Sequence, residues 1–288
     1  MFVLEGTTGW RFVVEELRRA GIQAHLAEPA EARALRGPKR RAKTDRADAR
    51  HLRDLLLTGT VPESWIPTDF IADLRTKVRL RKALVNQRSG WLKRIHAQLF
   101  QHGLPEPPSL RSVVGRQWLS AAELPATARQ VVELACGMVD VLDEQLAVLD
   151  AELAEVARTQ KGCLALRSQW GVGPVTSVSM LAELGDVSRF SSSRRVVRFA
   201  GLDVTVSESD GKRTRGHLSR QGPPVLRWAA YEAAGGAWRT ASPDHDYYLA
   251  TKRRLGAKRA RISVSRRILR RSYHLLTALG DAAIQPVA

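Results

Sequence analysis

The hydrophobic and polar positions at the start of the chain predict a β-α-β unit. A short apolar run over 1–4 ends in Glu5, and apolar residues then recur at helical spacing over 12–20. The segment 22–28 alternates in the manner of a strand, and Pro29 closes it. Such a crossover places two parallel strands in one sheet. Parallel sheets with so few strands are rare, so the pattern also predicts preceding strands that this sequence does not supply.

The middle of the chain predicts two long helices. Apolar residues recur at helical spacing over 69–102 and again over 121–159, and prolines separate the two stretches. We expect an antiparallel helical hairpin or coiled-coil arm over 68–160, which serves as a spacer or dimer contact rather than in catalysis. The flanking regions, 1–67 and 161–288, are then expected to be an α/β domain and a mostly helical domain.

The C-terminal region opens with a glycine-containing turn between two apolar helical segments. Gly171 and Gly173 belong to the sequence WGVGPV, which is typical of a helix-hairpin-helix. In that motif the amide groups at the start of the second helix face a phosphate. A plain helix-turn-helix connection explains the same residues equally well.

Composition adds a class of ligand to this picture. The chain has 46 Lys and Arg against 29 Asp and Glu, a formal net charge of +17, and many of these arginines lie in its C-terminal tail. Crowded cations without compensating acids favour a polyanionic partner, and nucleic acid is the usual one. No long apolar run or signal-peptide pattern is present, so we expect a cytoplasmic, nucleoid-associated protein without membrane contact. Cys136 and Cys163 are too far apart in sequence for a thiolate zinc motif and are expected to be reduced.

The segment 206–227 joins a candidate nucleophile, Ser209, to a group of cations in a glycine-punctuated loop. These cations are Lys212, Arg213, Arg215, Arg220 and Arg227. Glycine lets backbone N–H groups approach a phosphate, and basic side chains neutralise its charge. An ordinary solvated turn has the same residue types. His217 is a candidate acid or base, but a lone loop histidine is more often a hydrogen-bonding bystander.

Three carboxylates near the start of the chain form a candidate metal site. Glu5 ends the first predicted strand, and Asp45 and Asp48 are spaced to share one face of a helix. Clustered carboxylate oxygens are ligands for Mg²⁺, which assists phosphoryl transfer. The competing interpretation is helix capping, with Thr44 or Asp45 as the N-cap and Asp48 in the first turn. Spacing alone favours capping.

Four segments follow one another in a specific order: LEGTTGW, KTDRADAR, then beyond the arm GVGPVTSVSMLAELGDVSRFSSSRRVVRFAGL, and SESDGKRTRGHLSRQGPPVLR. In this order they resemble the IS110 (IS110/IS1111) family of insertion-sequence transposases, the DEDD recombinases. The resemblance covers nearly the whole chain. It implies an N-terminal RuvC-like, RNase H-like nuclease domain, here lacking its first strands, followed by a coiled-coil arm and a C-terminal transposase domain.

The resemblance also implies roles for particular residues. Glu5, Asp45 and Asp48 match the second, third and fourth acids of a Mg²⁺ site, and Ser209 matches a nucleophile that forms a covalent serine–DNA intermediate. The first acid has no counterpart, because in the family it lies on a strand well before the glutamate. We therefore expect either a start codon placed too late or a truncated copy. The implied partners are DNA, an element-encoded structured RNA that guides site choice, and further copies of the chain as a dimer or tetramer.

Two other functions are compatible with these residues. A catalytically inactive, nucleic-acid-binding remnant is favoured by the missing acid, whereas the intact serine segment argues against long decay. A RuvC-like junction nuclease would use water as its nucleophile and would form no covalent intermediate.

Overall fold

The computed structural model describes residues 1–36, 44–209 and 212–286, and for residues 206–209 and 212–215 it describes the backbone only. The chain divides into two compact units, Met1–Pro67 and Thr68–Ala288. Every helix in the described ranges is too short or too polar to cross a bilayer.

The first unit contains the β-α-β arrangement that the pattern predicts. Strand β1 (Phe2–Glu5) pairs in parallel with β2 (Ala24–Ala27), and α1 (Trp10–Arg19) connects them. Two further helices follow, α2 (Pro29–Ala34) and α3 (Asp45–Leu57). Helix α3 packs against β1, and its buried residues Leu52 and Leu55 join Ala27, Ala32 and Val3 in a small core.

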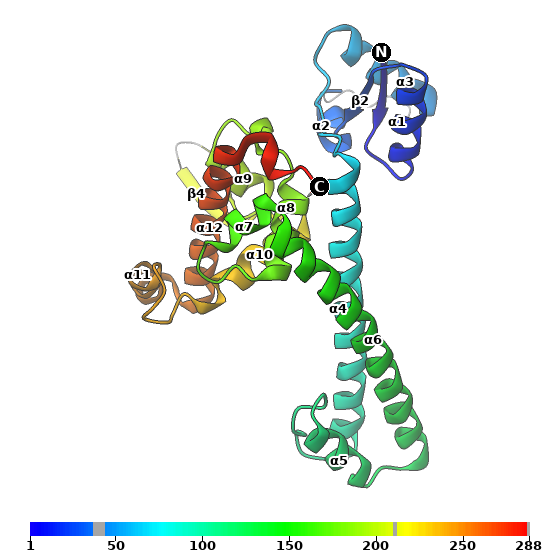
Figure 1. Cartoon of the computed structure of the whole chain (residues 1–288), viewed down its shortest axis with the longest axis vertical. Helices are drawn as coiled ribbons and strands as arrows, with labels where there is room; N and C mark the ends of the chain where they lie inside the picture. Colours follow the sequence, from blue (N-terminus) through cyan, green and yellow to red (C-terminus); the bar gives the residue numbers. More distant parts are fainter. Residues whose placement is uncertain (37–43, 210–211, 287–288) are drawn as a thin grey trace. The chain divides into compact units, whose positions relative to one another are not determined.

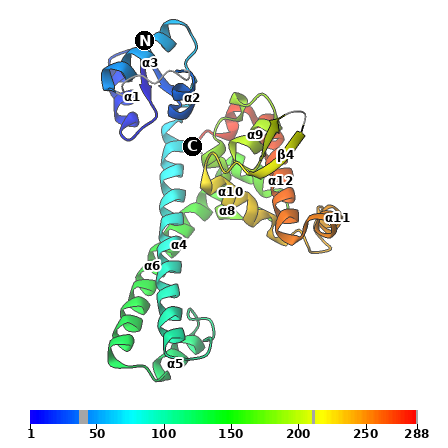
Figure 2. The same cartoon turned by 180° about the vertical axis from the view of Figure 1, so that it is seen from behind.

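The second unit begins with the long helices that form the predicted arm (Figures 1 and 2). Helix α4 (Asp69–Gln101) packs along α6 (Ala126–Thr159). From Ala128 to Leu146 the buried residues of α6 follow alternating steps of four and three, the spacing of a coiled-coil seam. On the α4 side Arg88 replaces an apolar residue in the seam, and its Nη1 lies 2.5 Å from Asp143 Oδ1. This pair and the neighbouring pair Arg81–Asp150 join arginines of α4 to aspartates of α6.

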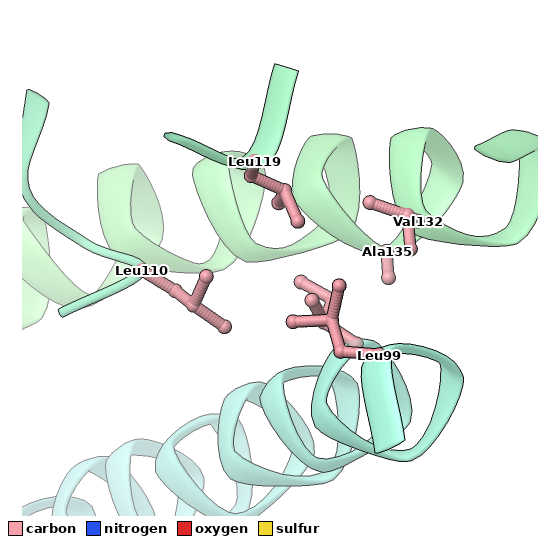
Figure 3. Packing of buried hydrophobic residues seen from close by; sticks show 6 residues of the cluster. Leu99, Leu110, Leu119, Val132 and Ala135 are labelled. Atoms are coloured by element: carbon pink, nitrogen blue, oxygen red, sulfur yellow. The ribbon is translucent and has the colours of Figure 1, made fainter. Parts of the chain in front are cut away.

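The tip of the arm contains a helix that the sequence pattern did not predict. Helix α5 (Val113–Ala121) is capped by Ser112, whose Oγ accepts a hydrogen bond from the amide of Gly115 at 3.1 Å. Figure 3 shows Leu110, which precedes α5, and Leu119 of α5 turned toward Leu99 of α4 and toward α6. Burial of these side chains closes the end of the hairpin.

The remainder of the second unit is a helical body built around one buried helix. Its helices are α7 (Lys161–Arg167), α8 (Pro174–Leu184), α9 (Ser193–Phe199), α10 (Pro224–Ala233), α11 (His245–Leu255) and α12 (Ala257–Leu279), with short 3₁₀ turns at Val187–Arg189, Ala234–Gly236 and Gly280–Ala283. Every residue of α8 from Ser177 onward is buried, and this helix contacts α4, α6, α7 and α10. Glu183 of α8 is 1% exposed and accepts two 2.9 Å hydrogen bonds from Arg79 of α4. This charge pair therefore ties the body to the arm.

The predicted serine loop is instead a β-hairpin. Strand β3 (Val204–Ser209) pairs antiparallel with β4 (Lys212–Leu218). Val204 pairs with Leu218, but Val206 pairs with Arg215, so two residues of β4 stand opposite Thr205 in a bulge. The prediction of a loop was wrong because it weighed turn-forming residues above the alternation of V-T-V-S.

Candidate functional site

The acidic residues near the chain start lie at the beginning of α3 and the end of β1. Thr44 is the N-cap of α3, and its Oγ1 accepts a hydrogen bond from the amide of Ala47 at 3.2 Å. Asp45 and Asp48 occupy the first turn, where a carboxylate stabilises the positive end of the helix dipole. The capping interpretation is therefore sufficient to explain both aspartates.

Asp48 has a second role in the first unit. Its Oδ1 lies 2.5 Å from Nη2 of Arg36, and both side chains are about one-third exposed or less. Glu5, at the carboxyl end of β1, pairs with Ala27 in the sheet. In the described ranges, no three histidine, cysteine or acidic side chains lie close enough together to hold a metal ion. The structure thus does not bring Glu5, Asp45 and Asp48 together as a ready ligand set.

Ser209 is the last residue of β3 and stands opposite Lys212, the first residue of β4. Glu208 pairs with Arg213, and Val206 with Arg215, so the predicted nucleophile and these cations belong to one hairpin. Their side chains lie outside the described part of the structure. The hairpin was not predicted from the sequence, although Asp-Gly between two alternating segments is a strong signal for one.

Close backbone packing holds the base of this hairpin against α9. Gly222 has φ +96°, and a Cβ there would lie 1.9 Å from the carbonyl oxygen of Phe199. Gly201 has φ +66°, and a Cβ there would lie 2.2 Å from the carbonyl oxygen of Gln221. Only glycine permits both the backbone conformation and the approach. The hairpin therefore leaves the helical body from a rigid base.

Two of the predicted phosphate-binding arginines belong to this base. Arg220 is exposed and has φ +52°, and its amide donates to the carbonyl of Gly201 at 3.1 Å. Arg227 donates through Nη1 to the carbonyls of Gly222 at 2.9 Å and Ala200 at 3.2 Å. Burial, followed by repulsion from Arg220, lowers the pKa of Arg227. Arg227 thus supports the turn, while Arg220 presents an exposed guanidinium beside the hairpin.

The turn between α7 and α8 has the helix-turn-helix order that the motif predicts. Gly171 has φ +81°, and a Cβ there would lie 2.1 Å from the carbonyl oxygen of Ala233 in α10. The amide of Gly173 donates to Oγ1 of Thr176 at 2.8 Å. Packing therefore explains Gly171, and the Gly173 amide already has a partner in the first turn of α8. A phosphate contact at this turn remains a prediction.

Many of the C-terminal arginines have partners within the protein. Arg271 forms hydrogen bonds of 3.1 and 2.6 Å to the carboxylate of Asp244, and Arg267 approaches the same group at 3.3 Å. Arg266 donates to the carbonyl of Leu202 at 2.7 Å, and Arg261 donates to that of Tyr231 at 2.7 Å. These cations look unpaired in the sequence because their partners, mainly backbone carbonyls and the buried Asp244, lie far from them along the chain. Their exposed neighbours, such as Arg253, Arg254, Arg259 and Arg270, remain available to a polyanion.

Sequence comparison relates this chain to known transposases. A model of the transposase IS116/IS110/IS902 family matches residues 163–249, which include the hairpin, and a DEDD-type IS110 transposase model matches residues 2–103. The chain is 29% identical over 208 residues to the insertion element IS116 uncharacterized 44.8 kDa protein of Streptomyces clavuligerus, covering 69% of this chain and 51% of that protein. It is 26% identical over 189 residues to the transposase for insertion sequence element IS1111A of Coxiella burnetii, covering 64% and 52%.

A longer match extends over most of the chain. The putative transposase y4rJ of Sinorhizobium fredii is 28% identical over 293 residues, covering 91% of this chain and 72% of that protein. In the two matches above, the chain spans about half the length of the relative. The two family models and these relatives agree with the motif order along the chain. The chain belongs to the IS116/IS110/IS902 family of insertion-sequence transposases.

Proposed function

We propose that this chain cuts and rejoins DNA strands through a covalent intermediate on Ser209. The observation that supports this most directly is the hairpin, in which Ser209 ends β3 opposite Lys212 and the neighbouring strand carries Arg213 and Arg215. Functional residues are commonly carried on short connections that a rigid scaffold positions. The close contacts of Gly201 and Gly222 supply such a scaffold.

The proposed reaction is a transesterification at phosphorus. The Ser209 hydroxyl oxygen forms a bond to phosphorus while the bond to the 3′ oxygen of the DNA breaks. The serine proton passes to a general base, and the leaving oxygen takes up a proton to become a free 3′-hydroxyl. Because one phosphoester replaces another, a second strand end can reverse the step without further energy. Lys212, Arg213, Arg215 and the exposed Arg220 would stabilise the charge that develops on the phosphate oxygens.

The DEDD family suggests a divalent metal for this reaction. Glu5, Asp45 and Asp48 are the proposed Mg²⁺ ligands. As the described residues stand, however, Asp48 is paired with Arg36 and no group of three ligands is formed. The proposed reaction therefore assigns no step to a metal ion. The proposed partners are an element-encoded RNA and further copies of the chain. The excess of positive charge is compatible with an RNA partner.

The second candidate is a nucleic-acid-binding remnant without catalysis. The absence of a ready metal-ligand group among the described residues favours it. It predicts binding without cleavage. A junction nuclease that uses water predicts a third result, cleavage without a covalent adduct.

One experiment separates the three. The purified chain is incubated with Mg²⁺ and labelled duplexes that carry the sequences flanking its own gene, and protein–DNA adducts are resolved on a denaturing gel. We expect adducts with the wild-type chain and with Ser207→Ala, a matched serine on the same strand, and none with Ser209→Ala. Affinity should change only a few-fold in either variant and should fall steeply with salt, because each neutralised phosphate contributes about 0.9 to the log–log slope.

Each departure from this result has a definite meaning. Adducts that persist in Ser209→Ala would dismiss Ser209 as the nucleophile. Salt-sensitive binding with neither cleavage nor adducts in the wild-type chain would favour the remnant. Cleaved DNA without adducts would favour the nuclease.

A further inference from the structure

A pocket of about 510 Å³ opens between the turn after α7 and one face of α12. Gln169 and Trp170 line it from the turn, and Arg271, His274, Leu275 and Ala278 line it from α12. Its volume is in the range of sites that bind small organic groups, about 300–1,000 Å³. The proposed strand-cleavage reaction assigns this pocket no role.

The pocket combines a flat aromatic wall with an apolar floor. Trp170 is 39% exposed, so part of its indole is open to a ligand. A Cβ on Gly236 would lie 3.4 Å from the indole Nε1, which shows that the neighbouring loop packs close to this ring. Leu275 and Ala278 are three residues apart and share one face of α12. A planar ring can therefore stack on Trp170 and cover apolar carbon at the same time.

Hydrogen bonds hold the polar side of the pocket in place. Gln169 is buried, and its Nε2 donates to Oγ of Ser272 at 2.9 Å. Its Oε1 lies 3.3 Å from Nε of Arg271, whose two terminal nitrogens bind the carboxylate of Asp244. The guanidinium plane of Arg271 is therefore fixed before any ligand arrives. A preformed wall of this kind reduces the entropy cost of binding.

The rim of the pocket is positively charged. Arg271 lines the pocket, and Arg267, four residues earlier, lies on the same side of α12. Asp244, which both arginines share, supplies one negative charge against their two. The charge that remains would attract an anionic group next to whatever ring enters the pocket.

Two other exposed aromatic residues of the helical body are paired with arginines. Trp238 is 59% exposed with the guanidinium of Arg239 5.6 Å from its ring centre. Tyr247 is 39% exposed with Arg267 4.4 Å from its ring centre. Aromatic rings interleaved with cations are typical of surfaces that bind unpaired nucleic acid, because bases stack on the rings while phosphates meet the charges.

We propose that this pocket receives one unstacked nucleobase of a single-stranded segment, with the base on Trp170 and its phosphate against the rim of α12. The proposal rests on the proposed function, because it takes the ligand to be a nucleic acid that is either the substrate or a partner of the chain. A DNA strand and an RNA strand supply the same ring and the same phosphate, and separate arms of the experiment distinguish them.

The test measures binding of the full chain to fluorescent single-stranded DNA and RNA oligonucleotides of one sequence, and to the DNA duplex. Loss of one stacked base weakens binding by about 5- to 150-fold. We expect a loss in that range on the preferred single strand for Trp170→Ala, recovery of most of the affinity in Trp170→Phe, and little change in Phe100→Ala. Phe100 is a suitable control because it is 85% exposed and lies on the arm. Whichever strand shows the loss, DNA or RNA, is the source of the base.

Two further measurements distinguish loss of the pocket from misfolding of a variant. Ala278→Leu narrows the pocket from an exposed position and should also weaken single-strand binding, with duplex binding retained. An abasic position moved along the oligonucleotide should reduce wild-type affinity at one place and have no further effect in Trp170→Ala. Equal single-strand affinities of wild type, Trp170→Ala and Ala278→Leu, with duplex binding intact, would overturn the pocket alone. If the chain bound no nucleic acid at all, the proposed function would fail with it.

Discussion

Gly222→Ala provides a direct test of the backbone packing that anchors the serine hairpin. The new Cβ would lie 1.9 Å from the carbonyl oxygen of Phe199 and 3.0 Å from its carbonyl carbon. Both neighbours are backbone atoms, so no side chain can rotate away to make room. The residue also has φ +96°, a conformation that residues with a Cβ rarely adopt.

A control variant separates the cost of the backbone conformation from the cost of the close approach. Placing an alanine in the left-handed region costs about 1–2 kcal/mol, and relieving overpacking by a backbone shift costs about 1–3 kcal/mol more. We therefore expect Gly222→Ala to lower the free energy of unfolding by about 2–5 kcal/mol. Gly103→Ala is the matched control, because Gly103 has φ +70° and a Cβ added there would have no neighbour within 4 Å. It should lose only the first amount.

Urea unfolding followed by far-ultraviolet circular dichroism measures both variants against the wild-type chain. The functional consequence is read from the serine adduct assay, in which Gly222→Ala should form fewer adducts because the base of the hairpin has shifted. If Gly222→Ala were no more destabilising than Gly103→Ala, the close approach to Phe199 would not be what requires glycine.

Two other predictions concern the core of the second unit. Leu99→Ala should destabilise the arm by about 2–5 kcal/mol, measured by urea unfolding, since Leu99 is 2% exposed, whereas its neighbour Phe100, 85% exposed, should tolerate alanine within about 0.5 kcal/mol. Equal effects of the two changes would contradict the packing at the tip. Burial raises the pKa of the Cys163 thiol from 9.0 to about 12. The pKa difference between the folded and the unfolded chain therefore leaves the contribution of Cys163 to stability complete below pH 9. That contribution is lost as the pH rises from 9 toward 12, because over this range the Cys163 thiol loses its proton in the unfolded chain but keeps it in the folded one. In the native chain at about pH 8, mass spectrometry should find Cys163 resistant to iodoacetamide, because the reactive form is the thiolate, and rapid native alkylation would refute its burial.

Much of the architecture could be predicted from local pattern. The β-α-β unit and the two arm helices follow from the spacing of apolar residues, because a helix or strand that buries one face repeats its apolar residues at its own period. The charge balance, the glycine turn at 171–173 and the order of the motifs likewise led to the transposase family. The N-cap role of Thr44 was foreseen as an alternative and is confirmed by its bond to Ala47.

The roles of individual polar residues depended on distant neighbours. Nothing near Asp48 in the motif KTDRADAR indicates that Arg36 will pair with it. Arg227 looked like a phosphate ligand, yet its partners are carbonyls that only the folded chain brings to it. The nucleophilic role of Ser209 and the metal-binding roles of the acids remain predictions.

By itself, the sequence determined the β-α-β unit, the two arm helices, the basic character and the family of this protein, since these depend on local spacing or on residue identity. Only the tertiary structure decided that Gly171 fits against Ala233 of α10 and that Trp170 shares a pocket with His274 of α12. Those contacts join residues that lie far apart along the chain. Their geometry is set by how buried surfaces pack together, which no local pattern specifies.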